Sequence, residues 1–93
     1  MISQRDLIKL SAWAKKNNAR IVFELEGKYN LAINKYLHAE DKAGSRVSWN
    51  RAFGPLPPSE VLSRFKVQRI VFVQGGQERE FSLKELKKLL ESL

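Results

Sequence analysis

Basic and aromatic side chains are interleaved in one short stretch of the chain, RVSWNRAF at residues 46–53. Lys42 precedes this stretch, and a proline-rich segment follows it. Cationic side chains bind phosphates, and an exposed Trp or Phe stacks on a base, so the pattern suits single-stranded nucleic acid. We therefore predict a nucleic-acid contact made by Lys42, Arg46, Trp49 and Arg51. The alternative is that the two aromatic residues anchor the core and the arginines lie on a solvated edge.

A second group of cations near the N-terminus has the spacing of one helix face: Arg5, Lys9 and Lys16. At about 100° per residue these three fall together, opposite an apolar arc. The arc contains Leu7, Ile8, Leu10, Trp13 and Ala14. A helix with such a stripe can lie along phosphates, which gives electrostatic support to the first group. The alternative is an ordinary solvated helix face.

Two enzymatic interpretations also arise from the residue types. The single histidine, His38, stands near Tyr36, Glu40 and Arg46, a set that could cleave RNA without a metal. Its alternative is a solvated histidine at a strand end. Glu26-Gly27-Lys28 has the Glu-x-Lys spacing of restriction-type nucleases, but no Asp lies in the strand before it. An ordinary polar hairpin explains that triplet.

Composition narrows the classes of protein. The chain has 93 residues, 43% hydrophobic and 29% charged, which is typical of one globular domain, residues 1–93. With no cysteine, disulfide scaffolds, zinc ribbons and iron–sulfur sites are excluded, and we expect no metal and no cofactor. No apolar run is long enough to cross a bilayer, and the first six residues lack the apolar core of a signal peptide. We therefore expect a cytoplasmic protein with no membrane partner.

Net charge is the strongest global feature. Seventeen Lys and Arg against ten Asp and Glu give +7 and a pI near 10.0. A basic domain of this size indicates a polyanionic partner, because released counterions drive binding to phosphates. The alternative is that the charge serves solubility. Size and basicity are also typical of phage, plasmid or other mobile-element accessory proteins.

The apolar pattern predicts a helix from Ser3 to Asn17 and then two alternating strands, Arg20 to Glu26 and Tyr29 to His38. A three-residue turn between the strands keeps one apolar face intact. It pairs Leu25 with Tyr29, Phe23 with Leu31 and Ile21 with Ile33.

The second half of the chain predicts a third strand, a short helix, a hairpin and a last helix. The predicted ranges are Arg46 to Phe53, Pro58 to Phe65, Lys66 to Gln74 with Glu78 to Phe81, and Ser82 to Leu93. The order α-β-β-β-(short α)-β-β-α predicts an α+β fold with a mostly antiparallel sheet of four or five strands and helices at both termini. A crossover helix between 53 and 66 allows one parallel pair.

Together these features predict a small, basic, non-enzymatic protein that binds single-stranded or duplex nucleic acid through phosphate contacts and aromatic stacking. The first alternative is an interaction module, an inhibitor or adaptor that docks on a protein of a nucleic-acid machine. The second is the small metal-independent ribonuclease. A homodimer formed through a sheet edge is also open.

Overall fold

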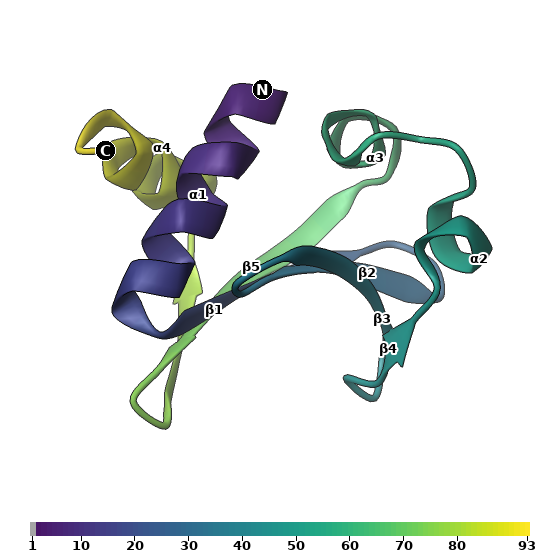
Figure 1. Cartoon of the computed structure of the whole chain (residues 1–93), viewed down its shortest axis with the longest axis horizontal. Helices are drawn as coiled ribbons and strands as arrows, with labels where there is room; N and C mark the ends of the chain where they lie inside the picture. The colour runs from purple at the N-terminus through teal and green to yellow at the C-terminus, as the bar shows by residue number, and fades with distance from the viewer. Residues whose placement is uncertain (1) are drawn as a thin grey trace.

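The computed structural model describes residues 2–93, which include one six-stranded sheet (Figure 1). The strands are β1 (Ala19–Leu25), β2 (Tyr29–Ile33), β3 (Leu37–Asp41), β4 (Arg46–Val47), β5 (Val67–Gln74) and β6 (Gln77–Phe81). Their order in the sheet is β4-β3-β2-β1-β5-β6, and every neighbouring pair is antiparallel. The α+β fold with an antiparallel sheet and terminal helices is confirmed, with more strands than expected. The parallel pair is wrong, because the crossover delivers β5 antiparallel to β1.

The predicted register of the first hairpin is confirmed. Ile21 lies opposite Ile33 and Phe23 lies opposite Leu31, with all four side chains fully buried. Gly27 lies in the turn at φ 104°, a conformation that glycine adopts without strain. The side-chain alternation of the strands therefore selected the loop length.

The predicted strand from Tyr29 to His38 is two strands joined by a turn. The Asn34 side-chain oxygen accepts a hydrogen bond from the Tyr36 backbone N–H, 3.1 Å away. An asparagine that bonds two residues ahead in this way imitates a backbone turn, so the chain reverses after β2. β3 then returns antiparallel to β2 and carries His38 and Glu40.

The predicted strand from Arg46 to Phe53 is wrong over most of its length. Only Arg46 and Val47 form a strand, β4, and the next residues form a short helix, α2 (Trp49–Phe53). The Ser48 hydroxyl caps this helix by accepting from the Arg51 N–H at 3.4 Å. Trp49 and Phe53 are one helical turn apart, so a single turn brings both toward the core.

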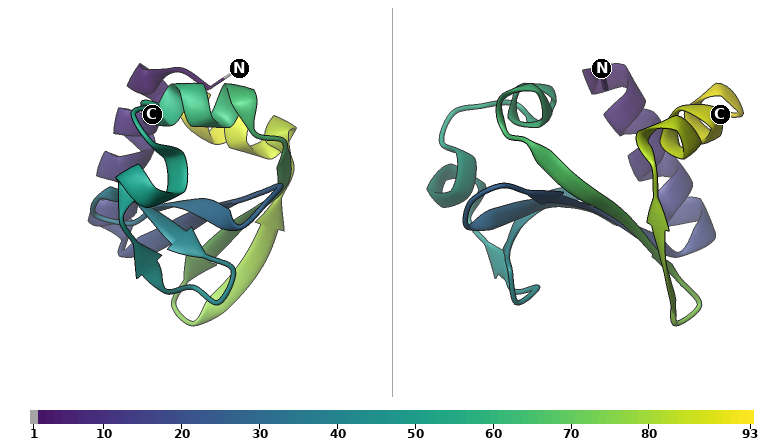
Figure 2. Two further views of the ribbon diagram at one scale, coloured as in Figure 1. Left: turned by 90° about the vertical axis from the view of Figure 1, so that its right-hand side faces the viewer. Right: turned by 180° about the vertical axis from the view of Figure 1, so that it is seen from behind.

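All the helices of residues 2–93 pack on one face of the sheet, and the other face has no helix over it (Figures 1 and 2). Besides α2 they are α1 (Gln4–Asn17), α3 (Pro58–Arg64) and α4 (Leu83–Glu91). The core between sheet and helices is built around the fully buried Leu7, Leu10, Phe23, Leu31 and Leu86. In Figure 1 the sheet arches, so that its helix-free face is concave.

Over residues 2–93, no helix combines the length and the apolar character that crossing a membrane requires.

Candidate nucleic-acid interface

The cations predicted on the first helix lie on the outward side of α1. Leu7, Leu10 and Ala14 are buried against the sheet, whereas Arg5 and Lys16 are exposed and Lys9 is half-buried. The stripe follows directly from the helical period, because positions three to four residues apart share a face. Lys15 is exposed on the last turn of the same helix.

α4 adds a second set of outward cations that are not among the predicted site residues. Leu86 is fully buried, while Lys84, Lys87 and Lys88 are exposed on the opposite side of the helix. α4 packs beside α1 on the same face of the sheet (Figure 1). The helical period already separated these lysines from the leucines, but only the structure places them next to α1.

The positive charge on α1 and α4 is poorly compensated. The two helices contain seven basic and three acidic residues, a net charge of +4, and none of the seven cations has a carboxylate oxygen within 4.0 Å among residues 2–93. Two of the three acids serve the helix ends. Asp6 accepts from the Ser3 N–H at 3.0 Å, and this hydrogen bond holds the pKa of Asp6 below its usual value. Glu85 accepts from the Ser82 N–H and from Arg79, each at 3.1 Å.

An aromatic side chain lies within the α1 stripe. Trp13 is half-buried, with its ring 5.7 Å from that of Phe72. It lines a shallow surface depression of about 430 Å³ together with Lys9, Ala12, Lys16, Asn17 and Leu93. Basic and aromatic residues are thus interleaved around Trp13 as well as around Trp49, although Trp13 was predicted only as part of the apolar arc.

The four residues predicted as the main contact lie at the other end of the molecule, around β4 and α2 (Figure 1). Arg46 and Arg51 are exposed, but Trp49 and Arg51 lie on a helix and not on one strand face. Trp49 is half-buried, its Nε1 donates to the Leu56 carbonyl at 2.9 Å, and its ring lies edge-on to Phe53 at 4.8 Å. Its indole therefore holds the segment between α2 and α3 against the fold, through the hydrogen bond to Leu56.

The side chain of Lys42, the fourth predicted contact, is hydrogen-bonded within the fold. Its Nζ donates to the Leu25 carbonyl and to the Asn30 side-chain oxygen, the latter at 2.6 Å. These bonds tie the loop after β3 to β1 and β2. The structure therefore separates the predicted site into two groups, Lys42 with Arg46, Trp49 and Arg51 at one end, and Arg5, Lys9 and Lys16 at the other.

The histidine considered for RNA cleavage belongs to an ion-pair network on the helix-free face. His38 Nε2 lies 2.6 Å from Glu40 Oε2, and Glu40 also accepts two hydrogen bonds from Arg20, one of them at 2.5 Å. His38 is 7% exposed and its Nδ1 faces the Tyr36 carbonyl at 3.4 Å. The imidazole therefore presents little surface to solvent.

Arg20 reaches Glu40 across the strand that separates them. Val22 on β1, Ala32 on β2 and His38 on β3 lie side by side in register. The β2 side chain between β1 and β3 at this position is therefore only the methyl group of Ala32. Burial alone would raise the pKa of Glu40, but hydrogen bonds from Arg20 and His38 outweigh it and hold the pKa below its usual value of 4.5. The network joins β1 to β3 across β2, on the face that no helix covers.

The Glu26-Gly27-Lys28 triplet compared with restriction-type nucleases lies in the β1–β2 turn, where Glu26 and Lys28 are exposed. Across residues 2–93, no three His, Asp or Glu side chains come close enough together to hold a metal ion.

Comparison with protein-family models, with curated protein sequences and with solved structures finds no match to this chain.

Proposed function

We propose that this protein binds nucleic acid through the phosphate backbone, using the outward faces of α1 and α4. The observation that carries the proposal is the concentration of uncompensated positive charge on these two adjacent helices. Cations without carboxylate partners are available to neutralise phosphates, and release of the counterions condensed on the nucleic acid then drives binding. No catalytic step is included in the proposal.

The same surface offers an aromatic contact for single strands. Trp13 lies between Lys9 and Lys16 in the depression on α1, so a base stacked there would keep its phosphates beside the lysines. Trp49 donates its indole N–H within the fold, so the proposal places base stacking at Trp13.

The first test is the salt dependence of binding to labelled single-stranded and duplex oligonucleotides, followed by fluorescence anisotropy. We expect affinity to fall steeply between 50 and 200 mM salt, on the scale of roughly 0.9 in the log–log slope for each duplex phosphate contact. Lys9→Gln with Lys16→Gln should lower that slope by about 1 to 2. The control is Lys28→Gln with Lys66→Gln, which removes the same charge at exposed positions at the far end of β1.

Equal losses in the two double variants would mean that only net charge matters and that α1 and α4 form no site. A salt-independent affinity would remove phosphate binding altogether.

Tryptophan fluorescence separates the two indoles. The Trp49→Phe variant retains only Trp13, and the Trp13→Phe variant retains only Trp49. We expect an unlabelled single strand to quench the emission of Trp49→Phe and to leave that of Trp13→Phe unchanged. The reverse result would return the stacking contact to Trp49 and α2.

A further inference from the structure

The outer edge of β6 carries backbone groups that no strand pairs. β6 is the last strand of the sheet and pairs only with β5. Gly75 and Gly76 form a two-residue turn with both φ angles positive, so the flanking pair Gln74 and Gln77 is hydrogen-bonded. Bonded and non-bonded pairs alternate along an antiparallel ladder. The N–H and C=O groups of Glu78 and Glu80 therefore point away from β5, toward the open edge.

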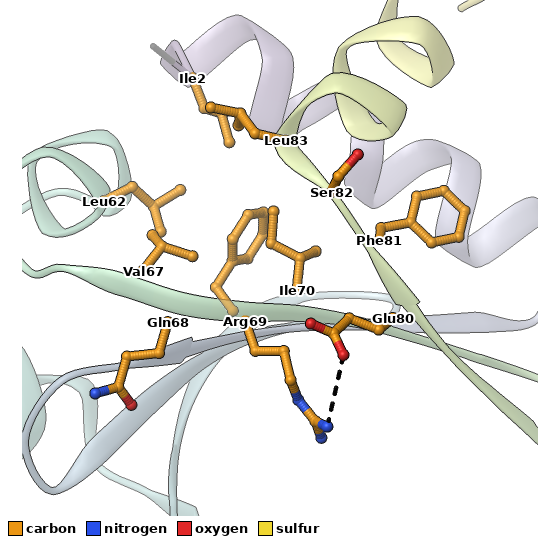
Figure 3. Close-up of a pocket in the computed structure, with 11 residues that line it drawn as sticks. Ile2, Leu62, Val67, Gln68, Arg69, Ile70, Glu80, Phe81, Ser82 and Leu83 are labelled. Carbon is orange, nitrogen blue, oxygen red and sulfur yellow. Dashed lines mark ion pairs between the residues drawn. The ribbon is translucent and has the colours of Figure 1, made fainter.

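On the helix-free side, this edge is acidic. The Glu78 and Glu80 side chains lie 4.0 and 3.9 Å from the Arg69 guanidinium, which forms its shorter contact, 3.0 Å, with Glu24. Figure 3 shows Arg69 and Glu80 projecting to the same side of the strands, away from the helices. Three carboxylates thus share one guanidinium. Next to β6, Glu78, Glu80 and Arg69 line a depression of about 260 Å³.

On the helix side, the same edge is aromatic. Phe81 stacks on Phe72 with ring centroids 3.7 Å apart, and the Trp13 ring lies tilted to Phe72 at 5.7 Å. With Leu89 these rings line a second depression of about 260 Å³, which Arg79 and Gln77 border at the strand. β6 therefore separates an acidic hollow on one side from an apolar hollow on the other.

We propose that β6 accepts an extended peptide segment of another protein, added as a seventh strand, in which basic and large apolar residues alternate. Backbone groups of the peptide pair with Glu78 and Glu80. Successive side chains of a strand point to opposite faces, so residues opposite Glu78 and Glu80 meet carboxylates. The residues between and beside them meet the aromatic hollow. The required pattern is apolar-basic-apolar-basic-apolar.

Charge argues against a second copy of this chain as the occupant. If β6 of one copy paired antiparallel with β6 of a second copy, the helix-free faces of the two copies would lie on the same side. Glu78 and Glu80 of one copy would then lie opposite Glu78 or Glu80 of the other. Like charges directly opposite destabilise a strand pair, and they are a common device against edge-to-edge association. A peptide strand with basic residues opposite Glu78 and Glu80 replaces this repulsion with attraction between opposite charges.

The probe is a fluorescein-labelled peptide of alternating valine and arginine with polar ends. Its controls are a peptide of the same composition with the valines and arginines in blocks, and an alternating peptide with glutamate in place of arginine. We expect the alternating basic peptide to bind the wild-type protein. Glu78→Lys with Glu80→Lys should weaken that binding about tenfold at low salt and allow the glutamate peptide to bind.

The matched control is Glu60→Lys with Glu91→Lys, which makes the same charge change on α3 and α4 and should leave peptide affinity unchanged. Hydrogen exchange gives a readout that charge alone would not produce. The Glu78 and Glu80 amides should become protected only when peptide is present, while Arg79 and Phe81 are protected by β5 in both states.

Equal loss in both double variants, equal binding of the block peptide, or unchanged exchange at Glu78 and Glu80 would each overturn the proposal. So would a dimer of the wild-type protein in sedimentation with those two amides already protected. Failure of oligonucleotide binding would leave this inference standing, because the β6 edge shares no cation with the proposed phosphate site.

Discussion

A single buried carboxylate joins β3 to β1 on the face that no helix covers. Glu40 is 3% exposed and receives hydrogen bonds from Arg20 and His38. Removing one member of a buried ion pair leaves its partner's charge uncompensated, which costs roughly 3–5 kcal/mol in a dry site. Arg20 is 33% exposed, so water can solvate part of that charge.

We expect Glu40→Gln to lower the free energy of unfolding at pH 7 by about 2–3 kcal/mol, less than for a dry pair because Arg20 reaches water. Urea unfolding followed by circular dichroism measures the change. Glu26→Gln, an exposed carboxylate in the β1–β2 turn, is the control and should change stability by less than about 0.5 kcal/mol. A Glu40→Gln effect as small as the control would mean that the network contributes nothing to stability.

The same residue predicts a pH dependence. The pKa of Glu40 is lower in the folded protein than its usual 4.5, so the unfolded chain takes up this proton first. The stabilisation is fully present above pH 4.5 and is lost as pH falls through the folded pKa. The wild-type advantage over Glu40→Gln should therefore shrink below pH 4.5. An advantage that persists unchanged at pH 3 would contradict this assignment.

At the level of elements, local signals predicted α1, the β1–β2 register, the Gly75-Gly76 hairpin and α4. Each depends on residues close in sequence: a capping box, an alternating face, or a two-glycine turn. The segment from Trp49 to Phe53 was mispredicted because an apolar spacing of four residues is compatible with both a strand face and a helical turn. The helix is stabilised by the Ser48 cap and by the packing of the Trp49 and Phe53 rings in the core.

α4 depends on its N-terminal cap. The Ser82 hydroxyl accepts a hydrogen bond from the Glu85 N–H at 3.1 Å, and the Glu85 side chain accepts one from the Ser82 N–H. Ser82→Ala should destabilise the protein by about 1 kcal/mol in thermal or urea unfolding. Ser59→Ala in α3 is the control, because the Ser59 side chain makes no hydrogen bond to any group in residues 2–93, and it should be nearly neutral. A neutral Ser82→Ala would mean that packing of Leu86 alone fixes the helix start.

At the level of the whole molecule, charge is distributed unevenly between the two faces of the sheet. α1 and α4 carry a net +4 on the helix side, whereas the helix-free side beside β6 gathers Glu24, Glu78 and Glu80 around Arg69. The sequence reports a net charge of +7 but not this separation, because it depends on which helices and strands pack side by side. The candidate site was predictable for Arg5, Lys9 and Lys16 and not for the lysines of α4.

The position of β1 in the sheet has a consequence for how the chain folds. β1 pairs on one side with β2, the next strand in sequence, and on the other with β5, which follows only after β3, β4, α2 and α3. Local pairs close small loops and form early, whereas the β1–β5 pair closes a long loop, so we expect it to form after the transition state. We expect Ile33→Val in β2 to slow refolding, and Val71→Ala in β5 mainly to speed unfolding, in stopped-flow measurements. If the two effects were reversed, β1 and β5 would form the nucleus, and the β1–β2–β3 meander would assemble onto them.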